Sequence, residues 1–170
     1  MLTGVGKIMT LQQATKHLFE AVHQKDPQAV SAAISAEAAI NARDRQNVTP
    51  LMYAARSGCL GAVKVLIGVE ANNRMIDSNG WTALFFAVAA GYADIVKALI
   101  SAGSEVNIKD KQGSTMLIYA VEKGHQDIIQ LLLEAGADVT AQRGDGQTAL
   151  GLATLLGQTD MIKTLSRKLK

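Results

Sequence analysis

GWTALFFAVAAGYADIV, the stretch from Gly80 to Val96, carries the pattern that decides the fold. Its hexapeptide TALFFA begins at Thr82, and related hexapeptides stand at one fixed interval from it: TPLMYA at Thr49, TMLIYA at Thr115 and TALGLA at Thr148. Each step is 33 residues long, without an insertion or a deletion. One period before the first of these copies, apolar residues keep the same positions, so the first segment is a degenerate fifth copy: Leu18, Ala21 and Val30. A fixed interval of this length is typical of a repeat protein.

Each copy predicts two short helices. The threonine can cap the first helix with its hydroxyl, and Pro50 suits the first helical position. A glycine nine residues after each threonine, such as Gly91, permits the left-handed conformation that ends this helix. A second helix with apolar residues at helical spacing follows and ends at Gly103. Two positions depart from the pattern, because Glu70 and Asn47 stand where other copies have glycine.

The turns between copies share the pattern Asp-x-x-Gly-x-Thr-x-Leu, as in DSNGWTAL from Asp77 and DKQGSTML from Asp110. This pattern at this period resembles the ankyrin repeat family, whose unit is a turn followed by two antiparallel helices. The resemblance implies an all-α repeat solenoid, in which β-turn or hairpin loops connect stacked helix-turn-helix units. We expect a flexible N-terminus at 1–10 and a single ankyrin repeat domain at 11–170. Its approximate units would be 11–43, 44–76, 77–109, 110–142 and 143–170.

The first and last copies are expected to act as caps with a polar outer side, because no neighbour covers that side of a terminal repeat. The first copy lacks the leading turn, and Asp26 and Pro27 start its second helix. The last copy ends in DMIKTLSRKLK, which keeps Ile162, Leu165 and Leu169 on one face and basic residues on the rest. The basic end is either a solvated cap, which is the simpler interpretation, or a patch for nucleic acid or lipid.

Composition and charge argue against several classes of function. A net charge of +2 is too small to indicate binding to nucleic acid or to a membrane surface. The N-terminal residues do not resemble a signal peptide, and the sequence contains no run of about 18 apolar residues that could span a membrane. The single cysteine, Cys59, rules out an internal disulfide and suits a reducing compartment. We therefore expect a cytoplasmic protein, with the nucleus as an open alternative.

The sequence lacks motifs that would carry chemistry. His17 and His23 are six residues apart, which is not the spacing of two metal ligands on one helical face. GVGK at Gly4 lacks the spacer and the hydroxyl residue of a phosphate-binding loop. We expect no enzymatic activity, no metal and no cofactor.

The resemblance also implies a binding surface. In the family, one exposed strip of each first helix lines a concave groove, and the turn tips overhang it. The corresponding tip residues here are Arg45, Gln46, Val48, Ser78, Asn79, Trp81, Lys111 and Gln112. The corresponding helix residues are Tyr53, Arg56, Phe86, Tyr119, Glu122 and Lys123.

The quoted stretch holds four of the chain's seven aromatic residues. Phe85 is expected to pack between units, and Tyr92 to be structural. Phe86 lies opposite the buried stripe of its helix, in line with tyrosines of the neighbouring units. This aromatic ladder is either the floor of the groove or half-buried under the turns. Trp81 has no counterpart of its size, so it either contacts a partner or lies on a neighbouring turn.

The expected function is that of a non-catalytic module that binds another protein through the groove and the turn tips. Such a partner would meet positive charge near Arg45 and Arg56 and apolar surface in the middle. We expect a monomer, because little apolar surface remains outside the groove. The alternative is a regulatory or targeting arm of a larger enzyme or channel, although polar caps at both ends would count against it. Family membership does not identify the partner.

Overall fold

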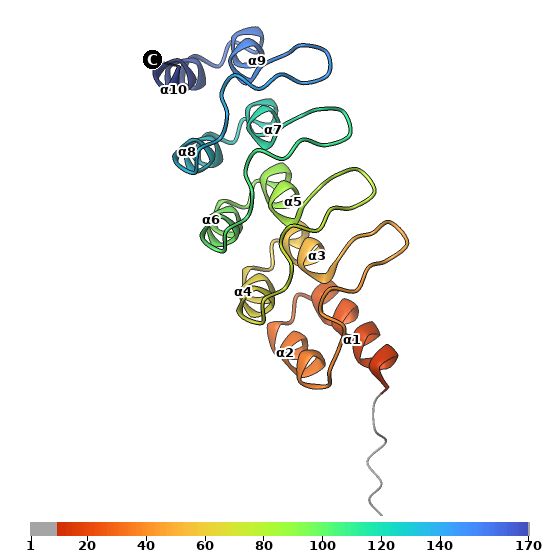
Figure 1. Ribbon diagram of the computed structural model, residues 1–170. Coiled ribbons are helices and arrows are strands. Elements are labelled where there is room, and N and C mark those ends of the chain that lie inside the picture. Colours follow the sequence, from red (N-terminus) through yellow and green to blue (C-terminus); the bar gives the residue numbers. More distant parts are fainter. Residues whose placement is uncertain (1–9, 170) are drawn as a thin grey trace, which may run out of the picture.

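The computed structural model describes residues 10–169, which form ten helices arranged as five stacked pairs (Figure 1). The first helices of the pairs stack as an inner row beside the projecting loops: α1 (Leu11–His23), α3 (Pro50–Ser57), α5 (Ala83–Ala90), α7 (Met116–Lys123) and α9 (Ala149–Leu155). The second helices stack as an outer row: α2 (Pro27–Ser35), α4 (Leu60–Gly68), α6 (Ala93–Ser101), α8 (Gln126–Glu134) and α10 (Thr159–Lys168). The predicted all-α stack is confirmed. The predicted flexible segment 1–10 lies, apart from Thr10, outside the described residues.

A threonine hydroxyl caps each inner helix, and the sequence predicted four of these five caps. The hydroxyls of Thr49, Thr82, Thr115 and Thr148 accept hydrogen bonds of 3.0–3.3 Å from the backbone N–H three residues later. Thr10 does the same for α1 at 3.2 Å. Because the first N–H groups of a helix have no partner within it, these bonds fix where each inner helix begins.

The core runs along the stack between the two rows of helices. Phe85 is 0% exposed, so its predicted packing role is confirmed. Tyr92 remains 38% exposed, but its ring lies across Gly58 at the C-terminal end of α3, the inner helix of the previous repeat. A Cβ added to Gly58 would stand 2.6 Å from this ring, so the close approach requires glycine there.

Four residues other than glycine adopt the left-handed backbone conformation, with φ between 56° and 62°: Lys25, Glu37, Asn47 and Glu70. Each stands at a repeat position that holds glycine in later copies. Glu70, for example, corresponds to Gly103, whose φ is 78°. The turn therefore imposes this conformation, whatever residue occupies it. A side chain with a β-carbon is strained there by about 1–2 kcal/mol.

The last helix pair is less polar than the sequence suggested for a cap. Leu165 of α10 is buried, but Leu155, Leu156 and Leu169 are 74%, 48% and 46% exposed. These leucines face solvent because, within residues 10–169, no further helix pair packs on α9 and α10. The expectation of a polar outer side is wrong for this part of the surface, although the basic residues of α10 are exposed.

Replacing Glu70 with glycine is expected to raise the free energy of unfolding by about 0.5–1 kcal/mol, because it removes a β-carbon from the left-handed region. Urea unfolding followed by circular dichroism measures the change. Gly103→Ala is the control at the equivalent position, where an added Cβ meets nothing within 4 Å. That control should lose stability through backbone strain alone. A Glu70→Gly protein less stable than wild type would contradict the expectation.

Candidate functional site

Aspartate carboxylates hold the turns that precede α3, α5 and α7. Asp77 is 7% exposed, and its Oδ1 accepts hydrogen bonds from the N–H groups of Asn79 and Trp81, both at 2.8 Å. Asp44 and Asp110 accept the equivalent pairs of N–H groups at 2.8–3.0 Å. These donors offset the cost of removing a charge from water. The three turns consequently share one shape.

Backbone hydrogen bonds also join the tips of successive turns. The Gln46 carbonyl accepts a bond from the Ser78 N–H at 2.9 Å. The carbonyls of Asn79 and Gln112, one and two periods later, accept equivalent bonds from the next turn at 3.0 and 3.1 Å. These bonds fix the turns relative to one another and give three side-chain amides equivalent positions on adjacent turns.

Trp81 lies in a cluster of aromatic rings. Its ring stacks on Phe85 at a centroid distance of 4.7 Å and meets Phe86 and Tyr119 edge-on at 5.2 and 5.3 Å. Phe86 is consequently only 8% exposed, which supports burial over an open groove floor. Trp81 packs on rings of its own unit and of the next one, and it remains half-buried.

The guanidinium of Arg56 lies between two rings of the inner row. Its Cζ is 4.7 Å from the centroid of Tyr53 and 5.7 Å from that of Phe86. The Tyr53 hydroxyl donates a hydrogen bond to Asp44 Oδ2 at 2.6 Å, and this bond fixes the Tyr53 ring. Burial alone would raise the pKa of Asp44, but the bonds from Tyr53 and two backbone N–H groups, together with the positive charge of Arg56, outweigh it and lower that pKa. The Arg56 guanidinium therefore lies between Tyr53 and Phe86, the first two rings of the predicted aromatic ladder, and interrupts it.

These groups surround one cleft of about 190 Å³ on the loop side of the inner row. It is lined by Gln46, Val48, Arg56, Asp77, Asn79, Trp81, Phe86, Gln112 and Tyr119. All of these except Asp77 were candidate residues from the sequence, where Asp77 indicated only a turn. Val48 was expected at an exposed tip but is 2% exposed, because it directly precedes the Thr49 cap and its side chain packs in the core.

The other six candidate residues lie around this cleft or farther along the inner row: Arg45, Tyr53, Ser78, Lys111, Glu122 and Lys123. Glu122 lies 3.6 Å from Arg143, which also pairs with Asp145 at 2.7 Å. The hydrogen bonds from Arg143 lower the pKa of Asp145 to about 2. Glu122, Arg143 and Asp145 are therefore paired with one another, whereas the exposed Lys123 forms no ion pair within residues 10–169.

Two residues of α1 extend the surface beyond the set that was predicted. Phe19 meets Tyr53 edge-on at 5.8 Å, and the His23 ring lies 4.6 Å from the same ring. The period could have indicated His23, because it stands 33 residues before Arg56. The absence of a leading turn in the first copy weakens that signal.

The sequence matches a family model described as ankyrin repeats (3 copies) in three overlapping segments, at residues 18–110, 70–143 and 103–169. The chain belongs to the ankyrin repeat family. A comparison with curated proteins found no match. Ankyrin repeats are generally non-catalytic modules that bind other proteins, so the family gives the class of function and leaves the partner open.

Neither a membrane helix nor a metal cluster is present in the part of the ankyrin stack that the structure describes. Across residues 10–169, every helix is too short or too polar to cross a membrane. Over the same residues, no three His, Cys, Asp or Glu side chains are grouped so that they could hold a metal ion.

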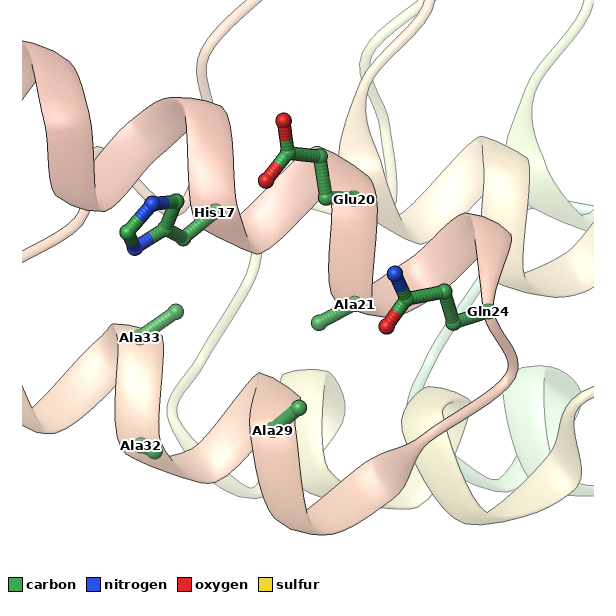
Figure 2. Close-up of a pocket in the computed structure, with 7 residues that line it drawn as sticks. All are labelled: His17, Glu20, Ala21, Gln24, Ala29, Ala32 and Ala33. Atoms are coloured by element: carbon green, nitrogen blue, oxygen red, sulfur yellow. The ribbon is translucent and has the colours of Figure 1, made fainter.

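A second hollow, of about 280 Å³, lies between α1 and α2 (Figure 2). Ala29 and Ala33 of α2 face α1 across it, while His17 lies on α1 and Gln24 directly follows its C-terminal end (Figure 2). The later ankyrin repeats place a fully buried leucine at the position of Ala33: Leu66, Leu99, Leu132 and Leu165. We interpret the hollow as a packing defect that the small side chain of the degenerate first repeat leaves behind.

Replacing Ala33 with leucine is expected to fill part of this hollow and to raise the free energy of unfolding by about 1 kcal/mol. Thermal unfolding measures the effect as an increase of about 2–4 °C in Tm. Ala32→Leu is the control, because Ala32 lines the same hollow but is exposed, so its gain should be smaller. A lower Tm for Ala33→Leu would mean that the two helices cannot accommodate the larger side chain.

Replacing Tyr53 with phenylalanine is expected to lower the free energy of unfolding at pH 7 by about 1 kcal/mol, because Asp44 loses a hydrogen bond. The folded protein depresses the pKa of Asp44 below 3.8, so the stability that this carboxylate contributes is present above that pH. It is lost as the pH falls through the folded pKa. The difference between the two proteins should therefore shrink at about pH 3.

Urea unfolding at both pH values tests this dependence. Tyr119→Phe is the control, since the Tyr119 hydroxyl contacts Asp110 at the longer distance of 3.3 Å and should contribute less. An equal loss of stability for Tyr53→Phe at both pH values would contradict the role of the Asp44 charge.

Proposed function

We propose that this chain is a non-catalytic module that binds another protein in the cleft between the turn tips and the inner helices. The observation that carries the proposal is the cleft itself, which gathers candidate residues from three adjacent repeats. Its walls are held before any partner arrives, because buried carboxylates shape the turns and backbone bonds join their tips. A surface ordered in advance loses little conformational entropy on binding.

The side chains around the cleft fall into two groups with different roles in this proposal. Phe86 and Val48 are more than nine-tenths buried, so they support the walls. Gln46, Arg56 and Gln112 are exposed and can contact a partner directly. A specific protein interface buries about 1,600 Å² in total, more than the cleft alone offers. A partner would therefore also cover the neighbouring tips, including Arg45, Ser78 and Lys111.

The rest of the proposal concerns the setting in which this binding takes place. We infer a cytoplasmic setting, which the single cysteine supports, because Cys59 is buried and has no second cysteine to pair with. We also propose a monomer. The alternative function, a regulatory or targeting arm of a larger enzyme or channel, would use the same cleft. One binding experiment therefore bears on both.

A photo-crosslinking amino acid placed at Gln112 is expected to give a discrete protein adduct in a lysate of the source organism. The same amino acid at Lys97, which is exposed on the outer helix α6, should not give that adduct. Excess unlabelled wild-type chain should abolish the adduct by competition. A competitor with Gln46→Ala and Gln112→Ala should compete about tenfold less well, since polar contacts at the cleft are lost.

Gln28→Ala is the matched control competitor, because Gln28 is exposed on α2 in the outer row. It should compete as well as the wild-type chain. Identical adducts from positions 112 and 97, or equal competition by all three chains, would overturn the proposal that the cleft binds the partner.

A further inference from the structure

Arg56 is an exposed cation that forms no direct ion pair with another described residue. Its guanidinium is held against Tyr53 and Phe86, yet it makes no ion pair within residues 10–169. Arg143, near the C-terminal end of the inner row, differs from Arg56, because it pairs with both Glu122 and Asp145. A guanidinium offers five N–H donors in a planar fork that matches a carboxylate.

The carboxylates nearest to Arg56 are already occupied. Asp44 accepts two backbone N–H bonds at Oδ1 and the Tyr53 hydroxyl at Oδ2. Asp77, which lines the cleft, accepts two backbone N–H bonds at Oδ1 and the Asn79 side chain at Oδ2, the latter at 3.2 Å. The Arg56 charge helps to lower the pKa of Asp44, but neither acid forms an ion pair with the guanidinium.

The turns that border the cleft carry other cations without an ion pair in the described part of the chain. Arg43, Arg45 and Lys111 are exposed on the adjacent turns and form no ion pair with another described residue. With Arg56 they are four exposed cations, against the three turn aspartates Asp44, Asp77 and Asp110, of which Asp77 and Asp110 are buried. The outer surface around Arg56 is therefore modestly positive. Such a local field favours an acidic ligand.

The remaining walls suit a peptide main chain and an apolar side chain. Trp81, Phe86 and Tyr119 form the apolar wall. The side chains of Gln46 and Gln112 have no hydrogen-bond partner among the described residues. An amide both donates and accepts, which is what a peptide group requires.

Adjacent inner helices pack about 10 Å apart, so three repeats span about 20 Å. An extended chain covers that distance with about six residues.

We propose that the cleft binds an extended acidic segment of a protein partner, with one carboxylate on Arg56 and an adjacent apolar side chain on the Trp81 wall. This assignment rests on the proposed function. The glutamine amides on the turn tips bond the main chain of the segment, and Arg56 selects its charge.

Selection from a library of random dodecapeptides tests the assignment, with the full chain, Arg56→Glu and Lys97→Glu as separate baits. The wild-type chain and the outer-row control Lys97→Glu are expected to select peptides with Asp or Glu next to apolar residues. Arg56→Glu should select Lys or Arg instead. Synthetic peptides selected by the wild-type chain should bind Arg56→Glu at least about tenfold more weakly than they bind the wild-type chain. Their binding to the wild-type chain should weaken at high salt.

Fluorescence of Trp81, the only tryptophan, reports whether a selected peptide occupies the cleft. Circular dichroism confirms that each bait is folded. Arg56→Met, which keeps the apolar stem, is the second variant and should show an intermediate loss.

Each other outcome overturns a distinct part of the inference. Peptides that change Trp81 fluorescence but are neutral or basic would overturn the acidic assignment and leave the proposed function standing. Peptides that bind without changing the fluorescence and without sensitivity to Arg56 would overturn both. Recovery of no peptide would overturn an extended segment as the ligand. Displacement of the peptide by a tighter-binding single-stranded oligonucleotide would assign the cleft to nucleic acid.

Discussion

The hydrogen bonds from backbone N–H groups to the turn aspartates are the interaction on which the candidate surface depends. Asp77 is almost completely buried, and a buried carboxylate is tolerated only where donors replace water. The N–H groups of Asn79 and Trp81 are those donors, so the charge and the turn stabilise each other. The same arrangement at Asp44 and Asp110 gives successive turns one geometry. The turn before α9 has Arg143 in place of this aspartate and still bonds to the Gln112 carbonyl, so the carboxylate belongs to the three turns that surround the cleft.

The candidate surface follows from that regularity. Each helix pair contacts only its neighbours, as expected for a solenoid, so residues one period apart come to lie side by side. The backbone carbonyls of Gln46, Asn79 and Gln112 join successive turns. The side chains of these same three residues consequently lie along one line of the surface. Backbone bonds thus provide the order of the surface, while the side chains at the same positions are free to vary. This separation explains how one scaffold can serve different ligands.

Local features of the fold could be predicted from the sequence, whereas burial at the site could not. The threonine caps and the helix-ending glycines depend on a few adjacent residues, and the 33-residue period repeats them. The burial of Val48 and Phe86 depends on what covers them, and the cover comes from residues that only the folded chain brings together. Likewise, Asp77 was recognisable as a turn residue, but its place in the cleft wall requires the neighbouring turns. That Arg56 forms no ion pair within residues 10–169 is a property of three-dimensional distances, so no spacing rule could reveal it.

Trp81 shows why folding and binding are difficult to separate at this surface. Its ring contacts those of Phe85, Phe86 and Tyr119, so it joins two adjacent repeats as well as lining the cleft. Removing it would loosen the inter-repeat contact and the binding wall together. Arg56 differs, because it lies on the rings from outside and its charged end is exposed. The shape of the cleft therefore comes from residues that also join the repeats, and the charge of Arg56 is the feature of this surface that a substitution can change while the aromatic cluster stays in place.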